Sequence, residues 1–190
     1  MMPLPSDYHP ETAADMPSES RPAAFRELHG PRLRGFALLL TLGDEASATR
    51  LAADALAAGS VRVIQLSHPE RAAAWLRQRV FREASDRASV GVQDGAGVVL
   101  ERLGVDAAGF AALGALNLRE RAALIATTVE QLDQRDVGTI VGLEGKRLER
   151  LVQRARRRVT AGAMGNPDAQ SASEGPLVTR IRAIAARALT

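Results

Sequence analysis

The sequence of 190 residues contains no cysteine. This excludes a disulfide framework, a thiolate metal site and a cysteine nucleophile. A chain without cysteine also fits a reducing compartment. We therefore expect a cytoplasmic protein.

Aromatic residues are scarce as well, at 3 % of the chain, although apolar residues make up 46 %. The apolar residues are mainly Ala, Leu and Val. Strands favour β-branched and aromatic side chains, whereas Ala and Leu are strong helix formers. The composition therefore predicts an all-α protein.

Long apolar runs are also missing. The longest, GFALLLTLG from Gly35 to Gly43, is much shorter than the roughly 20 residues that a membrane-spanning helix needs. It also lies too far from the N-terminus to resemble a signal peptide. We therefore expect no membrane partner.

Patterns that carry catalytic or metal chemistry are not found. His9, His29 and His68 lie far apart, without acidic or histidine neighbours at the spacing of metal ligands. The glycine-rich stretch from Asp94 to Gly97 lacks the Lys-Ser/Thr pair of a phosphate-binding loop. We expect no catalytic residue, metal, cofactor or small-molecule substrate, and hence no enzyme.

Charge is present but unevenly distributed. Residues 1–20 carry four acidic residues and no Lys or Arg, whereas residues 144–158 carry seven basic residues and two acidic ones. Such separation indicates a polyanionic partner for the basic segment. The plain alternative is a solvated helix face.

Glycine and proline mark the expected element boundaries. Helical spacing of apolar residues begins at Ala23, and Pro31 predicts a break or kink in this first helix. Gly43–Asp44 predicts a helix stop followed by an N-cap, and Pro69 predicts a helix start. Residues 60–67 (SVRVIQLS) resemble a strand locally, but without a second strand to pair with we expect a loop or an irregular helix end.

The chain is expected to hold two small helical modules joined by a flexible linker. The predicted segments are a disordered acidic tail (1–22), a first helical module (23–87), a linker (88–107), a helix-turn-helix module (108–160), a second linker (161–175) and a C-terminal amphipathic helix (176–190).

The stretch from Gln134 to Arg158, QRDVGTIVGLEGKRLERLVQRARRR, fits a helix-turn-helix. Gly142 would supply the positive φ of the turn, and Gly138, four residues earlier, would be the small residue where the two helices cross. The expected buried positions are Val137, Val141, Leu143, Leu148 and Leu151. An ordinary helical hairpin in a core is the alternative.

The outward face of the second helix favours DNA binding. Arg can form paired hydrogen bonds with guanine, and Gln can do the same with adenine. Other arginines can bind phosphate, which positions a protein without reading sequence. Glu144 fits the positive end of the helix dipole. The candidate DNA-binding residues are Lys146, Arg147, Arg150, Gln153, Arg154, Arg156, Arg157 and Arg158.

Residues 112–159 resemble region 4 of the extracytoplasmic-function type of bacterial sigma factors, without a gap. Matches at the start of the family pattern are Leu116, Arg119 and Arg121; later matches are Val129, Glu130, Leu132, Val137, Gly142 and Arg154–Ala155–Arg156. The resemblance implies a DNA-binding helix-turn-helix.

The first module is similar to sigma region 2, more weakly. Matching residues are Phe25, Leu33, Gly43–Asp44, Ala48, Leu51, Ala74–Trp75–Leu76 and Asp86–Arg87. The resemblance implies polymerase docking, for which the candidates are Leu51, Asp54, Thr49 and Arg50. However, Thr49–Arg50 replaces the family's acidic pair, and the loop that should capture single-stranded DNA has no aromatic residue.

The resemblance implies a sigma-factor-like transcription initiation protein. Its partners would be double-stranded promoter DNA, core RNA polymerase and, as a further candidate, an anti-sigma or other regulatory protein. One alternative is a degenerate homologue that acts as an interaction protein or DNA-binding regulator without opening promoters. Another is a plain DNA-binding regulator whose first module dimerises.

Overall fold

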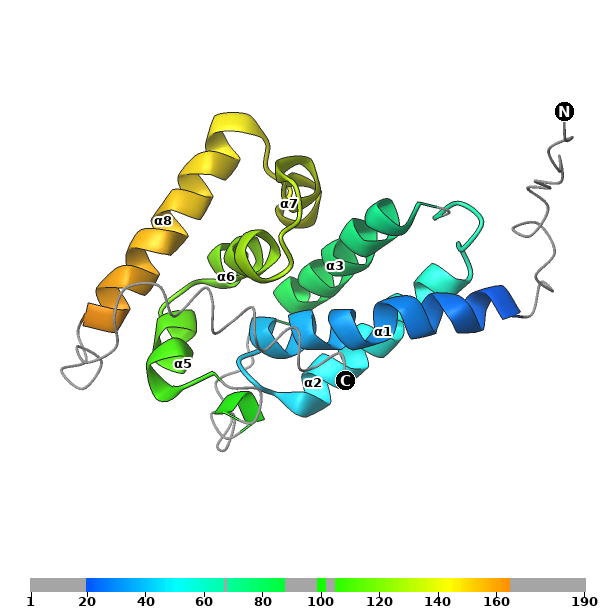
Figure 1. Cartoon of the computed structure of the whole chain (residues 1–190), viewed down its shortest axis with the longest axis horizontal. Coiled ribbons are helices and arrows are strands. Elements are labelled where there is room, and N and C mark those ends of the chain that lie inside the picture. Colours follow the sequence, from blue (N-terminus) through cyan, green and yellow to red (C-terminus); the bar gives the residue numbers. More distant parts are fainter. Residues whose placement is uncertain (1–19, 67, 88–98, 102–104, 165–190) are drawn as a thin grey trace, which may run out of the picture.

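The computed structural model describes residues 20–66, 68–87, 99–101 and 105–164 (Figure 1). These residues contain helices and no strand, which confirms the all-α prediction. The elements are α1 (Ser20–Leu40), α2 (Glu45–Ser60), α3 (Pro69–Asp86), α5 (Ala107–Gly114), α6 (Leu118–Leu124), the π-helical turn η1 (Ile125–Val129), α7 (Gln134–Val141) and α8 (Gly145–Met164). The predicted C-terminal helix, most of the acidic tail and much of both linkers lie outside the described residues.

Helix α1 runs without interruption through Pro31, so the predicted break is wrong. Proline removes one backbone hydrogen bond from a helix interior. Here Phe25 lies before the proline, Leu33 and Phe36 follow it, and all three are buried in the core. Burial of apolar side chains on both sides of Pro31 keeps the two halves of the helix together.

The boundaries of α2 and α3 follow the predictions. Asp44 caps α2 by accepting a hydrogen bond from the backbone N–H of Ser47 at 3.0 Å. Gly43, just before the cap, has a φ of 86°. Residues 61–66 form turns, as expected for an irregular connection, and Pro69 occupies the first turn of α3.

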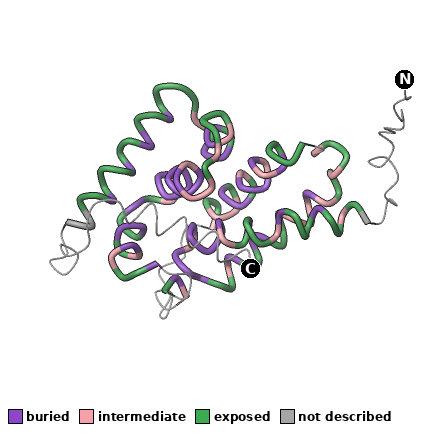
Figure 2. The backbone as a smooth tube through the Cα atoms, viewed as in Figure 1, coloured by how far each residue is buried: buried purple, intermediate pink, exposed green. Residues whose placement is uncertain are grey.

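The buried residues of both predicted modules belong to one continuous core (Figure 2). Helix α3 packs against α7, and α6 contacts α8 as well as α1 and α3. Leu100 and Val105, within the stretch expected to be a linker, are buried in the same core. The helices of residues 23–87 and 108–160 therefore pack as a single unit.

Polar side chains reinforce this packing between the two halves of the chain. Arg77 of α3 forms an ion pair with Glu130, which follows η1, and both side chains are almost fully buried. Gln78 Nε2 donates to the Thr139 carbonyl of α7 at 2.7 Å. These bonds fix α7, the first helix of the expected helix-turn-helix, on the surface of α3.

Candidate nucleic-acid interface

Helices α7 and α8 are joined by a turn that requires glycine at Gly142. This residue is the C-cap of α7 and has φ 70° and ψ 37°, in the left-handed region. Its N–H donates to the Gly138 carbonyl at 2.8 Å, and the Leu143 N–H donates to the same oxygen at 3.1 Å. The predicted role of Gly142 as the turn glycine is therefore confirmed.

Gly138 is the point of closest approach between α7 and the turn. A Cβ atom at this position would lie 2.7 Å from the Leu143 backbone oxygen, which is closer than real Cβ atoms come. A side chain here would therefore push the turn and α8 away from α7. The predicted apolar positions agree with this geometry: Leu143 is partly buried, and the fully buried ones are Val137, Val141, Leu148 and Leu151.

The opposite side of α8 is a row of polar side chains facing solvent. Figure 2 shows a helix that is exposed along most of its length, with a buried stripe toward the core. All eight candidate DNA-binding residues are exposed: Lys146, Arg147, Arg150, Gln153, Arg154, Arg156, Arg157 and Arg158. Helix α8 therefore presents a strongly basic surface beside the glycine turn.

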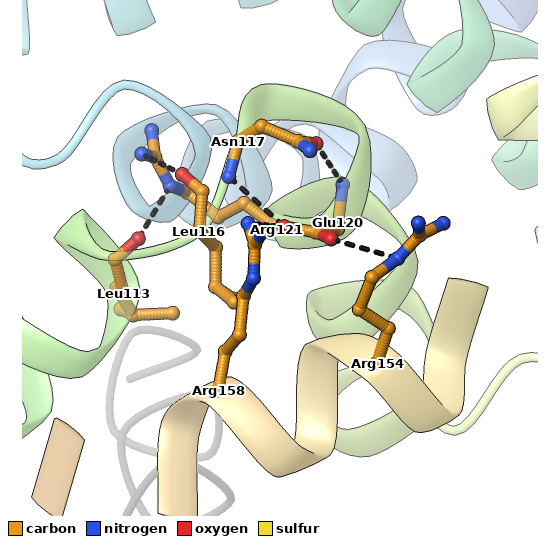
Figure 3. Close-up of polar contacts among 7 residues, drawn as sticks. All are labelled: Leu113, Leu116, Asn117, Glu120, Arg121, Arg154 and Arg158. Atoms are coloured by element: carbon orange, nitrogen blue, oxygen red, sulfur yellow. Dashed lines mark hydrogen bonds and ion pairs between the residues drawn. The ribbon is translucent and has the colours of Figure 1, made fainter. Parts of the chain in front are cut away.

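Two of these arginines, Arg154 and Arg158, are bound to a buried carboxylate (Figure 3). They therefore differ from the other basic residues of α8. Glu120 of α6 is 1 % exposed. Its Oε1 lies 3.1 Å from Arg154 Nε, and its Oε2 lies 2.8 Å from Arg158 Nη1. The Arg154 and Arg158 side chains are still 59 % and 50 % exposed, so the ion pairs do not remove them from the surface.

Glu120 itself is held by the start of its own helix. The Asn117 side chain accepts from the Glu120 N–H at 2.9 Å, and the Asn117 N–H donates back to Glu120 Oε2 at 3.3 Å, forming a capping box. The Asn-x-x-Glu pattern is visible in the sequence. The pairing with α8 is not, because Arg158 lies 38 residues further along the chain.

Arg121, next to Glu120, anchors α6 to two other helices. Its guanidinium donates to the carbonyls of Leu113, Leu40 and Leu116 at 3.0, 2.7 and 2.9 Å. Burial lowers the pKa of Arg121 to about 10. These contacts join the ends of α1 and α5 to α6, and they place Glu120 opposite α8. Arg121, one of the residues that match the family pattern, is therefore a buried residue that positions α6 and Glu120 relative to α8.

Leu51, a candidate for polymerase docking, does not lie on the surface. Its side chain is 2 % exposed because it belongs to the apolar face with which α2 joins the core. This small exposed fraction leaves no surface on which a large protein could dock, so the structure places Leu51 in the core rather than on a docking face. Thr49, Arg50 and Asp54 are exposed on α2.

Neither a metal site nor a membrane-spanning helix is found among the residues that the structure describes. In the part of the chain that the structure describes, no three His, Asp or Glu side chains are grouped so that they could hold a metal ion. Among the described helices, none is both long and apolar enough to cross a membrane. No protein-family model, curated protein or solved structure matches the chain.

Proposed function

We propose that this protein is a sigma-factor-like transcription initiation protein that binds promoter DNA through α8 and core RNA polymerase through its first three helices. The observation that supports DNA binding is the combination of the Gly138–Gly142 crossing with the exposed basic face of α8. A helical hairpin that served only the core would need no such face. The proposal of a polymerase partner rests on the sequence resemblance.

The position of each polar residue along α8 indicates whether it would contact bases or phosphates. In a helix-turn-helix, the first turns of the second helix contact base edges in the major groove. Lys146, Arg147, Arg150 and Gln153 occupy these turns. The residues beyond them, including Arg156 and Arg157, would contact phosphates. Base reading is thus assigned to the end of α8 that follows the glycine turn.

Replacing Arg150 with Ala tests this assignment. The substitution should weaken binding to the selected site by about 1–3 kcal/mol and relax specificity at one base pair. The full-length protein would first select sites from a random duplex library, and fluorescence anisotropy would then compare the two proteins on matched and altered sites.

Arg26→Ala is the matched control, since Arg26 is exposed on α1 and distant in sequence from the helix-turn-helix. It should leave affinity unchanged. An equal loss on every DNA sequence for Arg150→Ala would assign Arg150 to phosphate contact, and the absence of any loss would contradict the proposed interface.

Polymerase binding is tested by pull-down with bacterial core RNA polymerase, followed by run-off transcription from a promoter library. Binding together with specific transcripts is the expected result. Duplex DNA binding without polymerase binding would contradict the initiation function but leave the DNA interface intact.

One observation favours a second candidate, a DNA-binding or interaction protein that does not open promoters. Unpaired bases are captured by stacking on aromatic side chains. The turn residues 61–66 contain no aromatic residue, and their exposed large side chains are Val61 and Ile64, at 88 % and 79 %. This candidate predicts DNA affinity without transcripts.

A further inference from the structure

A pocket of about 430 Å³ lies where the two halves of the chain meet. Its walls come from the α1–α2 turn, the first turns of α2, the end of α3, and the connection from α5 to α6. Its volume falls within the range of about 300–1,000 Å³ that is usual for small-molecule sites. A ligand there would touch residues from both 23–87 and 108–160.

The polar lining of this pocket carries both signs of charge. Arg50, Arg87 and Arg121 supply positive charge, and Asp44 supplies one negative charge. The Arg121 guanidinium already donates to three backbone carbonyls. Arg87 Nη2 pairs with Glu83 Oε1 at 2.6 Å on its own helix, which leaves Arg50 and the Nη1 atom of Arg87 best placed to receive an anionic group.

Unsatisfied hydrogen-bonding atoms concentrate at the same place. Among the described residues, three buried side-chain atoms lack a hydrogen-bond partner, and two of them, Asp44 Oδ2 and Arg87 Nη1, belong to residues of this pocket. A buried polar atom without a partner costs about 1–3 kcal/mol. One is an acceptor on an acid and the other a donor on a base, so a ligand that satisfied both would need a donor and an acceptor.

Asp44 remains ionised in this setting. Burial alone would raise the pKa of its carboxyl group. Hydrogen bonds from Ser47 and the Ala46 backbone, together with the positive charge of Arg50, outweigh burial and lower the pKa below its ordinary value. Asp44 is 5 % exposed, and its carboxylate keeps a negative charge near neutral pH. It therefore favours a cationic donor over a neutral one.

The remaining lining is apolar. Leucines from three segments contribute, namely Leu40, Leu42, Leu51, Leu116 and Leu118. We propose that the pocket binds a free amino acid with an apolar side chain, with its carboxylate on Arg87 and Arg50, its ammonium on Asp44, and its hydrocarbon against the leucines. Such a zwitterion would offer an acceptor to Arg87 Nη1, a donor to Asp44 Oδ2 and apolar surface to the leucines.

Ligand binding at this junction would stabilise the packing of the two halves. A molecule that binds the folded chain and not the unfolded chain raises the free energy of unfolding. Because the pocket spans the α1–α2 turn and the α5–α6 connection, the stabilisation would act on the same packing that places α6 and Glu120 against α8. The site is thus suited to sense an amino acid.

Titration calorimetry of the full-length protein with L-leucine, L-methionine and L-phenylalanine tests the proposal. At least one should bind and raise the melting temperature. Two analogues of leucine each remove one charge: 4-methylpentanoate lacks the ammonium, and 3-methylbutylamine lacks the carboxylate. Each should bind about tenfold more weakly or worse, since each loses a charge-assisted hydrogen bond.

Two variants locate the site. Asp44→Asn keeps an N-cap residue for α2 but removes the charge, and Arg87→Gln removes the other partner; each should weaken amino-acid binding about tenfold. Arg82→Gln, an exposed arginine on the same helix as Arg87 outside the pocket lining, is the control and should bind normally. Failure of all three amino acids to bind, or unchanged binding in both pocket variants, would overturn the proposal. DNA binding by the protein without amino acid is measured separately, and neither result bears on the proposed DNA interface.

Discussion

Glu120 contributes both to the stability of the fold and to the arrangement of the candidate DNA interface. Its carboxylate closes the capping box of α6 and also binds Arg154 and Arg158 of α8. A carboxylate buried to this extent is stable only when it is paired and hydrogen-bonded. The two arginines provide the pairing, and they are thereby partly withheld from any external anion.

Replacing Glu120 with Gln separates the capping box from the ion pairs, because Gln also serves in capping boxes but carries no charge. Arg154 and Arg158 should then be free to bind phosphate. We expect tighter DNA binding at low salt and a steeper salt dependence, by up to about two units of log–log slope for two added phosphate contacts. Stability should fall by about 1–3 kcal/mol.

Fluorescence anisotropy across a salt series and urea unfolding measure the two effects. Glu149→Gln is the control, since Glu149 is exposed on α8 and accepts a long hydrogen bond from Gln134 at 3.4 Å. An unchanged salt slope in Glu120→Gln, with lower stability, would show that Glu120 acts on packing alone.

At the scale of elements, several helices begin directly after an Asp or Asn. Asp44, Asp106, Asn117 and Asp133 are the N-caps of α2, α5, α6 and α7, and each side chain accepts a backbone N–H of the first turn. These side chains satisfy N–H groups that a helix start leaves without partners. These caps fix where α5, α6 and α7 begin, and this part of the chain therefore forms short helices rather than one long helix.

The close crossing of α7 and α8 can be tested by adding a Cβ atom at Gly138. Gly138→Ala places a Cβ against the Leu143 carbonyl, a backbone atom that can move only with the turn. We expect a loss of about 1–3 kcal/mol in stability and weaker DNA binding, because α8 shifts relative to α7. Urea unfolding and anisotropy measure both.

Gly35→Ala is the matched control. Gly35 lies inside α1, where nothing lies within 4 Å of an added Cβ. It should stabilise the protein by about 0.5–1 kcal/mol, because Ala is the better helix former. If Gly138→Ala stabilised the protein as Gly35→Ala is expected to, the close approach of Gly138 to the turn would be contradicted.

At the scale of the whole molecule, the buried pair Arg77–Glu130 joins the two halves of the chain. Arg77 also lies over the Phe36 ring, 5.8 Å from its centre, and its Nε has no hydrogen-bond partner. Removing the charge of Glu130 leaves a buried cation without its counter-charge. Such a change lowers the free energy of unfolding more than the loss of an exposed ion pair does.

We therefore predict that Glu130→Gln destabilises the protein by about 3 kcal/mol and that unfolding remains a single transition. Fluorescence of Trp75, the one tryptophan, reports on the first half of the chain, and far-UV circular dichroism reports on all helices. Their unfolding curves should coincide. Separate transitions would show that the halves fold independently.

The control for this prediction is Glu83→Gln. Glu83 pairs with Arg87 four residues away on the same helix, and both side chains are more exposed than those of the buried pair. The change should cost less than about 1 kcal/mol.

The sequence by itself determined the helical class, the starts of α2 and α3, the glycine turn, and which residues of α8 face solvent. These depend on contacts within a few residues: caps, the backbone freedom of Gly142, and the apolar stripe through Leu148 and Leu151. Local propensity and periodicity report such contacts directly.

Only the tertiary structure decided the continuity of α1 through Pro31, the burial of Leu51, the binding of Arg154 and Arg158 by Glu120, and the shared core of the two halves. Each of these depends on residues tens of positions apart. Their energies come from burial and from pairing of charges, which exist only once the helices have packed. The sequence pattern therefore locates the basic helix, and the packing decides which of its arginines remain available to DNA.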